Sequence, residues 1–365
     1  MKPTLSFPFY AKASLVFIGL FAFIGMLFIS QKIILPIIYS IIIAIVLSPV
    51  VNFFVRKKIS RVIAIAITLL LVIFTTIIFI ALLSAQIMQF SESFPKLIEK
   101  FHLLVEQTIF WVSNNFDIST VKINLWINEK HVELMKGSSS VIGQTLVLTG
   151  SMLMILILIP VYTFMILYYQ PLLIEFIHKL FKSSDQAEVN EVLFATKKII
   201  RSYLVGLLLE AAIIATLNSV SLLILGIDYA ILLGIIGAIV NVIPYIGGIV
   251  AVALPMMIAL ATKSSSSYCI LVLAVYIVIQ FVDNHYIIPK VVASKVKINA
   301  LISIIVVLAG GALWGVPGMF LSIPLTAILK VIFDHTDNLK PWGFLLGDTM
   351  PPFLGMKTPF KLKTK

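Results

Sequence analysis

Long, charge-poor apolar blocks constrain the fold of this 365-residue chain more than any other feature of its sequence. A helix needs about 20 apolar residues to cross the hydrocarbon core of a bilayer, which is about 30 Å thick. Because 60% of the residues are hydrophobic and only 12% are charged, a soluble enzyme fits the sequence poorly. The chain is predicted to be an all-α polytopic integral membrane protein with eight apolar blocks, at about 13–31, 33–55, 62–88, 141–169, 204–225, 229–262, 264–288 and 298–333.

Two of these blocks are too long for one straight crossing. The block at 229–262 would run about 51 Å as a single helix, at about 1.5 Å per residue. Its middle carries Asn241 followed by Pro244, Gly247 and Gly248, where proline removes a backbone donor and glycine permits positive φ. We predict about six full spans plus two re-entrant helical hairpins whose tips gate a cavity; kinked hairpins that only pack tightly are the alternative. The second hairpin, at 298–333, is interrupted by Gly310, Gly311, Gly315, Pro317 and Gly318.

The basic residues indicate which side of the membrane each segment faces. Arginine and lysine near span ends are retained in the cytoplasm, so the cluster at 56–61 places the loop between the second and third blocks inside. Both termini are then cytoplasmic, and a first hairpin that enters from the exterior keeps Lys290, Lys295 and Lys297 inside as well. Since this orientation explains the net charge of +11, no nucleic-acid partner is predicted.

Six regions follow from the apolar blocks and the charges between them. In the segment that faces the exterior, apolar residues recur at helical spacing between Pro95 and Val112, which predicts an amphipathic helix on the outer leaflet or against a partner subunit. The first block is predicted to be an uncleaved helix, because no small-residue cleavage site follows it. The regions are N-terminal transmembrane helices at 1–88, the exterior segment at 89–140, a transmembrane helix at 141–169, cytoplasmic linker helices at 170–203, a transport core at 204–333 and a cytoplasmic tail at 334–365.

Three acids lie within the apolar blocks or at their edges: Glu210, Asp228 and Asp283. A carboxylate at bilayer depth is costly, so such a residue faces water, an ion or a partner group. Glu210 and Asp283 each lie about six residues from the inner end of their block, and we predict that they share one cavity. Asp228 is interpreted as a turn residue at the interface. The alternative for Asp283 is a structural salt bridge to Lys290 or Arg201.

Uncharged polar residues accompany these two acids. Gln280, Asp283 and Asn284 lie at helical spacing on one face of the seventh block, in a stripe that begins at Tyr276. Asn218 lies on approximately the Glu210 side of the fifth block, and Asn241 precedes the first hairpin tip, where capping a broken helix is its alternative role. The predicted substrate- or ion-binding set is Glu210, Asn218, Asn241, Gln280, Asp283 and Asn284.

The sequence contains no motif that is typical of an enzyme active site or a metal centre. Cys269 is the single cysteine and lies in an apolar block, which leaves no disulfide framework and no thiolate cluster. The five histidines lack the spacing of metal ligands, and no phosphate-binding Walker A loop is present. The sequence therefore predicts a protein that is not an enzyme and holds no cofactor or metal.

Several short motifs follow one another in the C-terminal half. In these residues, and in the pattern of spans over about 1–335, the chain resembles the autoinducer-2 exporter (AI-2E) family of bacterial permeases. Asn299 and Ala300 stand where that family commonly has a His-Pro pair, so any role of that histidine is absent here. The motifs are Arg201–Gly206 (RSYLVG), Leu225–Ile227, Leu233–Gly234, Asn241–Gly248 (NVIPYIGG), Gln280–Pro289 (QFVDNHYIIP), Gly310–Gly318 (GGALWGVPG) and Ser322–Leu325.

The resemblance implies an exporter of the bacterial inner membrane, usually oligomeric and with cytoplasmic termini. Export of a small polar solute such as a signalling molecule is the leading hypothesis, with the amides of Asn241, Gln280 and Asn284 binding hydroxyls or carbonyls. A Na⁺(Li⁺)/H⁺ antiporter that uses Asp283 and Glu210 is the second, and a non-transporting interaction scaffold is the third. The expected partners are the lipid bilayer, a small polar solute or a monovalent cation or proton, and further copies of the chain.

Overall fold

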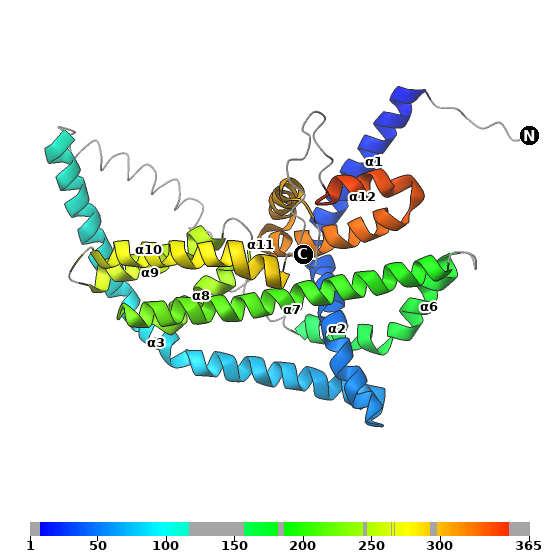
Figure 1. The fold of residues 1–365 in the computed structure, drawn as a ribbon, viewed down its shortest axis with the longest axis horizontal. Coiled ribbons are helices and arrows are strands. Elements are labelled where there is room, and N and C mark those ends of the chain that lie inside the picture. The colour runs from blue at the N-terminus through cyan, green and yellow to red at the C-terminus, as the bar shows by residue number, and fades with distance from the viewer. Residues whose placement is uncertain are drawn as a thin grey trace, which may run out of the picture.

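A computed structural model describes residues 8–116, 157–181, 186–243, 247–263, 265, 267–292 and 298–349 (Figure 1). This part of the chain is helical, with one isolated antiparallel bridge between Ile298 and Gly347 and no sheet. The helices are α1 (Phe9–Ile29), α2 (Gln31–Arg56), α3 (Arg61–Phe116), Ile157–Tyr168, α6 (Gln170–Leu180), α7 (Gln186–Ile224), α8 (Ala230–Asn241), α9 (Gly247–Thr262), α10 (Ser267–Val282), a π-helix (Asp283–Val292), α11 (Ala300–His335), a 3₁₀ turn (Asp337–Leu339) and α12 (Lys340–Leu346).

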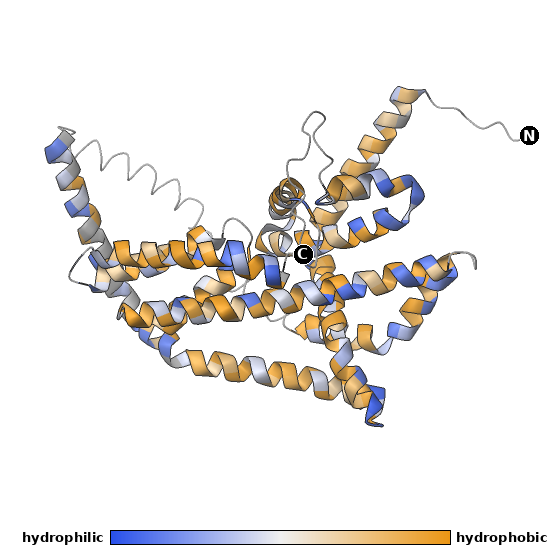
Figure 2. Cartoon of the chain, viewed as in Figure 1, coloured by the Kyte–Doolittle hydropathy of each residue, from blue (hydrophilic) through white to orange (hydrophobic). Residues whose placement is uncertain are grey.

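The described helices confirm the all-α polytopic membrane class. Six of these helices are long and apolar enough to cross a membrane: α1, α2, the first part of α3 (Arg61–Ser84), α7, Ser267–Val291 and α11, although α11 is broken at Gly315. The helix at Ile157–Tyr168 and α6 add a pair bent by 64°. Figure 2 shows apolar residues along α1, α2 and the first part of α3. Large apolar side chains there are exposed, such as Phe21 of α1 at 82%, which suits a helix surrounded by lipid.

Helix α3 joins two segments that the sequence analysis separates. It continues from the third apolar block through the predicted amphipathic stretch, and Pro95 lies inside it instead of starting a new helix. The amphipathic stretch is helical as expected, and the exposed Phe110 and Trp111 lie near its end. Residues 117–156, which include the rest of the predicted exterior segment, lie outside the described residues.

Hairpin 1 consists of α8 and α9, whose arms of 12 and 16 residues are about 18 and 24 Å long. Both arms are shorter than the hydrocarbon core, and they pack against each other. A Cβ atom on Gly237 would contact Ala251 at 3.6 Å, and one on Gly247 would collide with the Val240 carbonyl. The block at 229–262 therefore folds back on itself, as its length predicts. The tip residue Pro244 lies outside the described residues.

Hairpin 2 consists of the two arms of α11, which reverse direction at Gly315. This glycine has φ 64° and ψ −146°, a conformation that L side chains avoid. A Cβ atom on Gly310 would lie 2.5 Å from the carbonyl oxygen of Gly318, although residues eight apart in a straight helix are separated by about 12 Å. The block at 298–333 is therefore also doubled back. The entry of the two hairpins from opposite sides of the membrane stays a prediction.

Helices α1 and α2 form hydrogen bonds with the tip of hairpin 2. The indole Nε1 of Trp314 donates a hydrogen bond to the Leu27 carbonyl of α1 at 3.1 Å. The Tyr39 hydroxyl of α2 donates to the Pro317 carbonyl at 3.2 Å, and the Tyr39 ring stacks on Phe320 with centroids 6.0 Å apart. The bond from Trp314 thus joins the tip of hairpin 2 to α1, and the bond from Tyr39 joins it to α2. Thus α1 and α2 pack directly on the predicted transport core.

Candidate functional site

The two carboxylic acids of the apolar helices are buried near each other. Glu210 of α7 is 5% exposed, and Asp283, the first residue of the π-helix, is fully buried. Helix α7 packs against the π-helix that begins at Asp283. The alternative of a structural salt bridge from Asp283 to Arg201 or Lys290 stays a prediction. The structure buries Glu210 and Asp283 on two elements that pack against each other.

Asp283 also accepts a hydrogen bond from the tip of hairpin 1. The amide Nδ2 of Asn241, the last residue of α8, donates a hydrogen bond to Asp283 Oδ2 at 2.9 Å. Asp283 Oδ1 is buried and has no hydrogen-bond partner among the described residues. Because buried carboxylate oxygens are normally satisfied, Oδ1 marks a place where a ligand group can bind.

Gln280 lies against the other side of the same tip. A Cβ atom on Gly248, at the start of α9, would lie 2.5 Å from Gln280 Oε1. A side chain larger than that of glycine at position 248 would therefore push the Gln280 amide away from the tip. Gln280 lies one helical turn before Asp283, so the two side chains and Asn241 line the junction between hairpin 1 and α10.

Asn218 and Asn284 are placed away from this junction. Asn218 is 2% exposed, and its Nδ2 lies 3.2 Å from where a Cβ on Gly237 would stand, at the contact between α7 and α8. It lies eight residues beyond Glu210, or about 12 Å along α7. Its Oδ1 is buried without a partner in the described structure. Asn284 is exposed, so the structure does not group it with the buried acids.

The tip of hairpin 2 reaches the junction through apolar packing. Val242, which follows Asn241, belongs to one apolar cluster with Val307 and Leu321 of hairpin 2. No described hydrogen bond joins the tip of hairpin 2 to Glu210 or Asp283. Its predicted gating residues lie at the turn between the arms, where the tip faces α1 and α2: Gly310, Gly311, Gly315, Pro317 and Gly318.

A cavity of about 390 Å³ opens at the opposite end of α8 from Asn241. Two amides of α3, Gln86 and Gln89, face it, and Gln86 Oε1 accepts a hydrogen bond from the Leu232 amide at 3.0 Å. Asp228 is exposed in the turn before α8, as its interpretation as a turn residue requires. Neither glutamine is among the predicted site residues, because that prediction was built around the two acids of the fifth and seventh apolar blocks and the first hairpin tip. The lining residues are Gln86, Gln89, Leu223, Ile227, Asp228, Tyr229, Ala230 and Ile231.

Comparison with known proteins agrees with the arrangement of spans and broken helices. The family model described as AI-2E family transporter matches residues 15–338. The chain belongs to the AI-2E transporter family. Within this family it is 24% identical over 332 residues to the putative transport protein YueF of Bacillus subtilis, covering 88% of this chain and 87% of YueF.

Two further AI-2E relatives differ in how much of this chain they match. The AI-2 transport protein TqsA of Escherichia coli is 24% identical over 329 residues, which cover 87% of this chain and 90% of TqsA. The putative transport protein YrrI of Bacillus subtilis is 34% identical over 133 residues, 36% of this chain and 37% of YrrI. The chain is therefore a multi-pass membrane protein of a transport family, and the solute named for TqsA is a property of that protein.

Proposed function

We propose that this AI-2E family member exports a small, uncharged polar solute across the bacterial inner membrane. The observation that carries the proposal is the junction at Asp283, where a broken helix, a buried carboxylate and two amides meet. Broken backbone at membrane depth is tolerated where it lines a cavity or a solute path. The unpartnered oxygen Oδ1 of Asp283 favours a ligand that donates hydrogen bonds.

The polar groups at the junction favour hydroxyl-bearing solutes over anions. Asp283 offers an acceptor, while the side-chain amides of Asn241 and Gln280 offer both donors and acceptors. An anionic solute would place its charge beside the buried carboxyl of Asp283, which Coulomb repulsion opposes. A sugar-like or other polyol solute would instead satisfy Oδ1 without adding like charge.

In the proposed route, solute crosses between this junction and the cavity beside Asp228. Helix α8 separates the two places by about 18 Å, roughly the length of its 12 residues. Tilting of hairpin 1 about its contact with α7 would open the junction to one side at a time, as in alternating access. Cytoplasmic termini and an oligomeric state belong to the same proposal.

Exchange of Na⁺ or Li⁺ for protons is the second candidate, favoured by one specific observation. Two carboxyls, those of Glu210 and Asp283, are buried on elements that pack against each other. A monovalent cation or a proton would relieve the energetic cost of two like charges at membrane depth. In this case the pair Glu210 and Asp283 would be the ion site itself.

Metabolite profiling of a deletion strain tests the leading proposal. We expect small polar metabolites to accumulate in the cytosol and to fall in the medium, and the wild-type gene should restore the ratio. Identical profiles with and without the gene would reject export. Purified protein in vesicles with an internal pH dye tests the second candidate, since an antiporter should move protons after a pulse of NaCl or LiCl but not of choline chloride.

Substitution of Gly248 by alanine should weaken the same export while leaving the fold intact. The new methyl group would displace Gln280 Oε1, the end of a flexible side chain, so the amide moves and the helices stay. Loss of one neutral hydrogen bond costs about 0.5–1.5 kcal/mol, which predicts about a 2- to 10-fold lower export rate. The control is Gly19→Ala in α1, where nothing lies within 4 Å. Wild-type export by Gly248→Ala would show that the position of Gln280 is unimportant.

A further inference from the structure

Two side chains of α3 bind the base of hairpin 1, which is the start of α8 together with the end of α9. Gln86 Oε1 accepts a hydrogen bond from the Leu232 amide at 3.0 Å. Lys100 Nζ donates a hydrogen bond to the Ala261 carbonyl at 2.8 Å. Helix α3 is therefore bonded to both arms of hairpin 1, at the ends that lie away from the tip.

Both bonds go to backbone groups that a helix leaves without a partner. Leu232 is the third residue of α8, and the first four amides of a helix have no acceptor within it. Tyr229, which precedes α8, provides no side-chain cap, and its ring packs against Phe90 of α3 with centroids 5.4 Å apart. Ala261 is the last residue but one of α9, where carbonyls lack donors and a positive charge is favourable. Helix α3 thus caps both arms.

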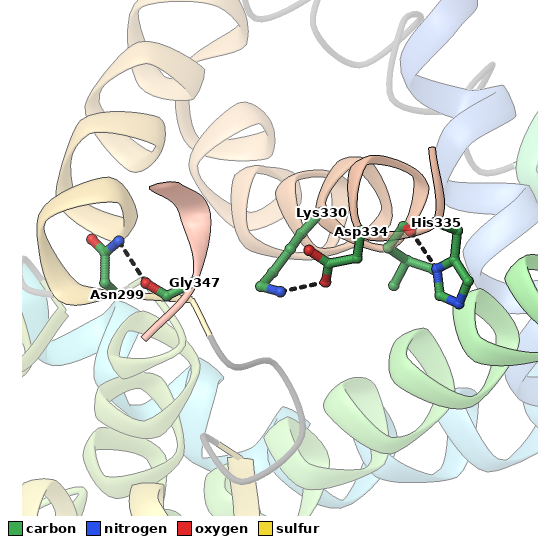
Figure 3. A network of polar contacts seen from close by, with 6 residues as sticks. Asn299, Lys330, Asp334, His335 and Gly347 are labelled. Atoms are coloured by element: carbon green, nitrogen blue, oxygen red, sulfur yellow. Dashed lines mark hydrogen bonds and ion pairs between the residues drawn. The ribbon is translucent and has the colours of Figure 1, made fainter. Parts of the chain in front are cut away.

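Hairpin 2 is bonded in a different way, through the segment that follows it. Asn299, directly before α11, donates from Nδ2 to the carbonyls of Leu345 and Gly347 at 2.8 and 2.9 Å (Figure 3). Ile298 also pairs with Gly347 in a backbone bridge. The tip of hairpin 2 is bonded to α1 and α2. Hairpin 2 is therefore fixed at its base and at its tip, whereas α3 holds hairpin 1 through the ends of two long side chains.

The middle of α8 packs closely on α7. A Cβ atom on Gly234 would collide with Ser219 of α7, so the two backbones approach each other at this position. Leu232 is bonded to α3 before this contact, and Asn241 is bonded to Asp283 after it. A close contact within a short helix suits a pivot, because the two ends of the helix then move in opposite directions. A tilt that moves the tip of hairpin 1 therefore also moves its base relative to α3.

We propose that Gln86 and Lys100 are positioning residues that hold hairpin 1 in its closed position and release it when it tilts. Hairpin 1 is then the moving element, and hairpin 2 stays in place. The inference rests on the proposed function for the tilt of hairpin 1. The cavity of about 390 Å³ at the start of α8 adjoins Gln86 and leaves room for this end of the helix to move.

Distances between spin labels test the proposal in the full chain, without any solute. Cys269→Ser removes the one native thiol, and Phe194→Cys with Ile249→Cys then carry nitroxide labels. Both side chains are exposed, the first on α7 and the second near the tip of hairpin 1. Phe194→Cys with Val316→Cys reports the tip of hairpin 2 in the same way. The distances are measured by double electron–electron resonance in nanodiscs.

Gln86→Met and Lys100→Met each remove one bond to hairpin 1 and keep a long, unbranched side chain. A minor conformation commonly accounts for about 0.1–10% of molecules. Loss of one bond should raise the ratio of tilted to closed hairpin 1 about 2- to 10-fold, and loss of both about 4- to 100-fold, because distant sites act additively. The label on hairpin 1 should therefore gain a second distance in the double variant, while the label on hairpin 2 keeps one.

Two control variants separate positioning from a general effect on the fold. Gln86→Glu keeps an acceptor oxygen for the Leu232 amide, and an acid suits the start of a helix, so the single distance should return. Gln89→Met changes the lining of the same cavity and should have no effect. Wild-type distances in the double variant would overturn the proposal. Equal changes in both label pairs would also overturn it, because α3 would then stabilise the fold as a whole.

The same measurement separates this inference from the proposed export. If the distances respond as expected but the deletion strain has wild-type metabolite profiles, the control of hairpin 1 by α3 stands and only the export of a polar solute is rejected. If the profiles change but the distances do not, export stands and the role given to Gln86 and Lys100 is rejected.

Discussion

Asp283→Asn should abolish most transport and leave the fold unchanged. The amide has nearly the same shape as the carboxylate and still accepts the bond from Asn241, so the tip of hairpin 1 stays in place. What is lost is the charged acceptor Oδ1, and hydrogen bonds to charged groups contribute about 1.5–3 kcal/mol. We expect about a 10- to 100-fold lower export rate, measured as the medium-to-cytosol metabolite ratio in the complemented deletion strain.

The control for this change is Asp337→Asn. Asp337 is exposed and paired with Lys340 at 2.6 Å, and such surface pairs contribute about 1 kcal/mol or less. Equal transport by Asp283→Asn and the control would reject Asp283 as a binding residue. If Asp283→Asn kept solute export but lost a sodium-evoked proton flux, the second candidate function would be favoured instead.

The arrangement of hairpins was predictable because helix length and bilayer thickness leave few solutions. A charge-free run over 229–262 has to break, and Asn241 to Gly248 is where proline and glycine allow it. The similar depth of Glu210 and Asp283 was predictable from their equal distance to the inner ends of their blocks, but the packing of α7 against the π-helix was not. Their role as a binding pair stays a prediction.

The contacts that complete the site could not be predicted from periodicity. The predicted stripe includes Asn284 beside Asp283, but successive residues of an α-helix already differ by about 100° in direction, and in the structure Asn284 is exposed while Asp283 is buried. The bond from Asn241 to Asp283 links residues 42 apart, and the bond from Trp314 goes to a backbone carbonyl. Sequence patterns report faces of single helices and not which faces meet.

Gly318→Ala, at the tip of hairpin 2, should destabilise the protein strongly. The new Cβ would overlap the carbonyl oxygen of Gly310 and lie 2.8 Å from its carbonyl carbon, and both are backbone atoms that cannot turn aside. Overpacking of this kind costs about 1–3 kcal/mol or more. A lower melting temperature in detergent, measured by loss of the size-exclusion peak after heating, would report it.

Two neighbouring glycines and one distant glycine give a graded control series for Gly318→Ala. Gly311→Ala would meet only the flexible end of Met319, at 2.6 Å from its Cε, and should cost less. Gly25→Ala in α1 meets nothing within 4 Å and should stabilise its helix by about 0.5–1 kcal/mol. Gly310→Ala meets the Gly318 carbonyl and should resemble Gly318→Ala. Equal melting temperatures of the Gly318→Ala and Gly25→Ala variants would mean that the two arms of α11 are not in close contact. The hydrogen bonds from α1 and α2 to this tip would then not be expected to form as described.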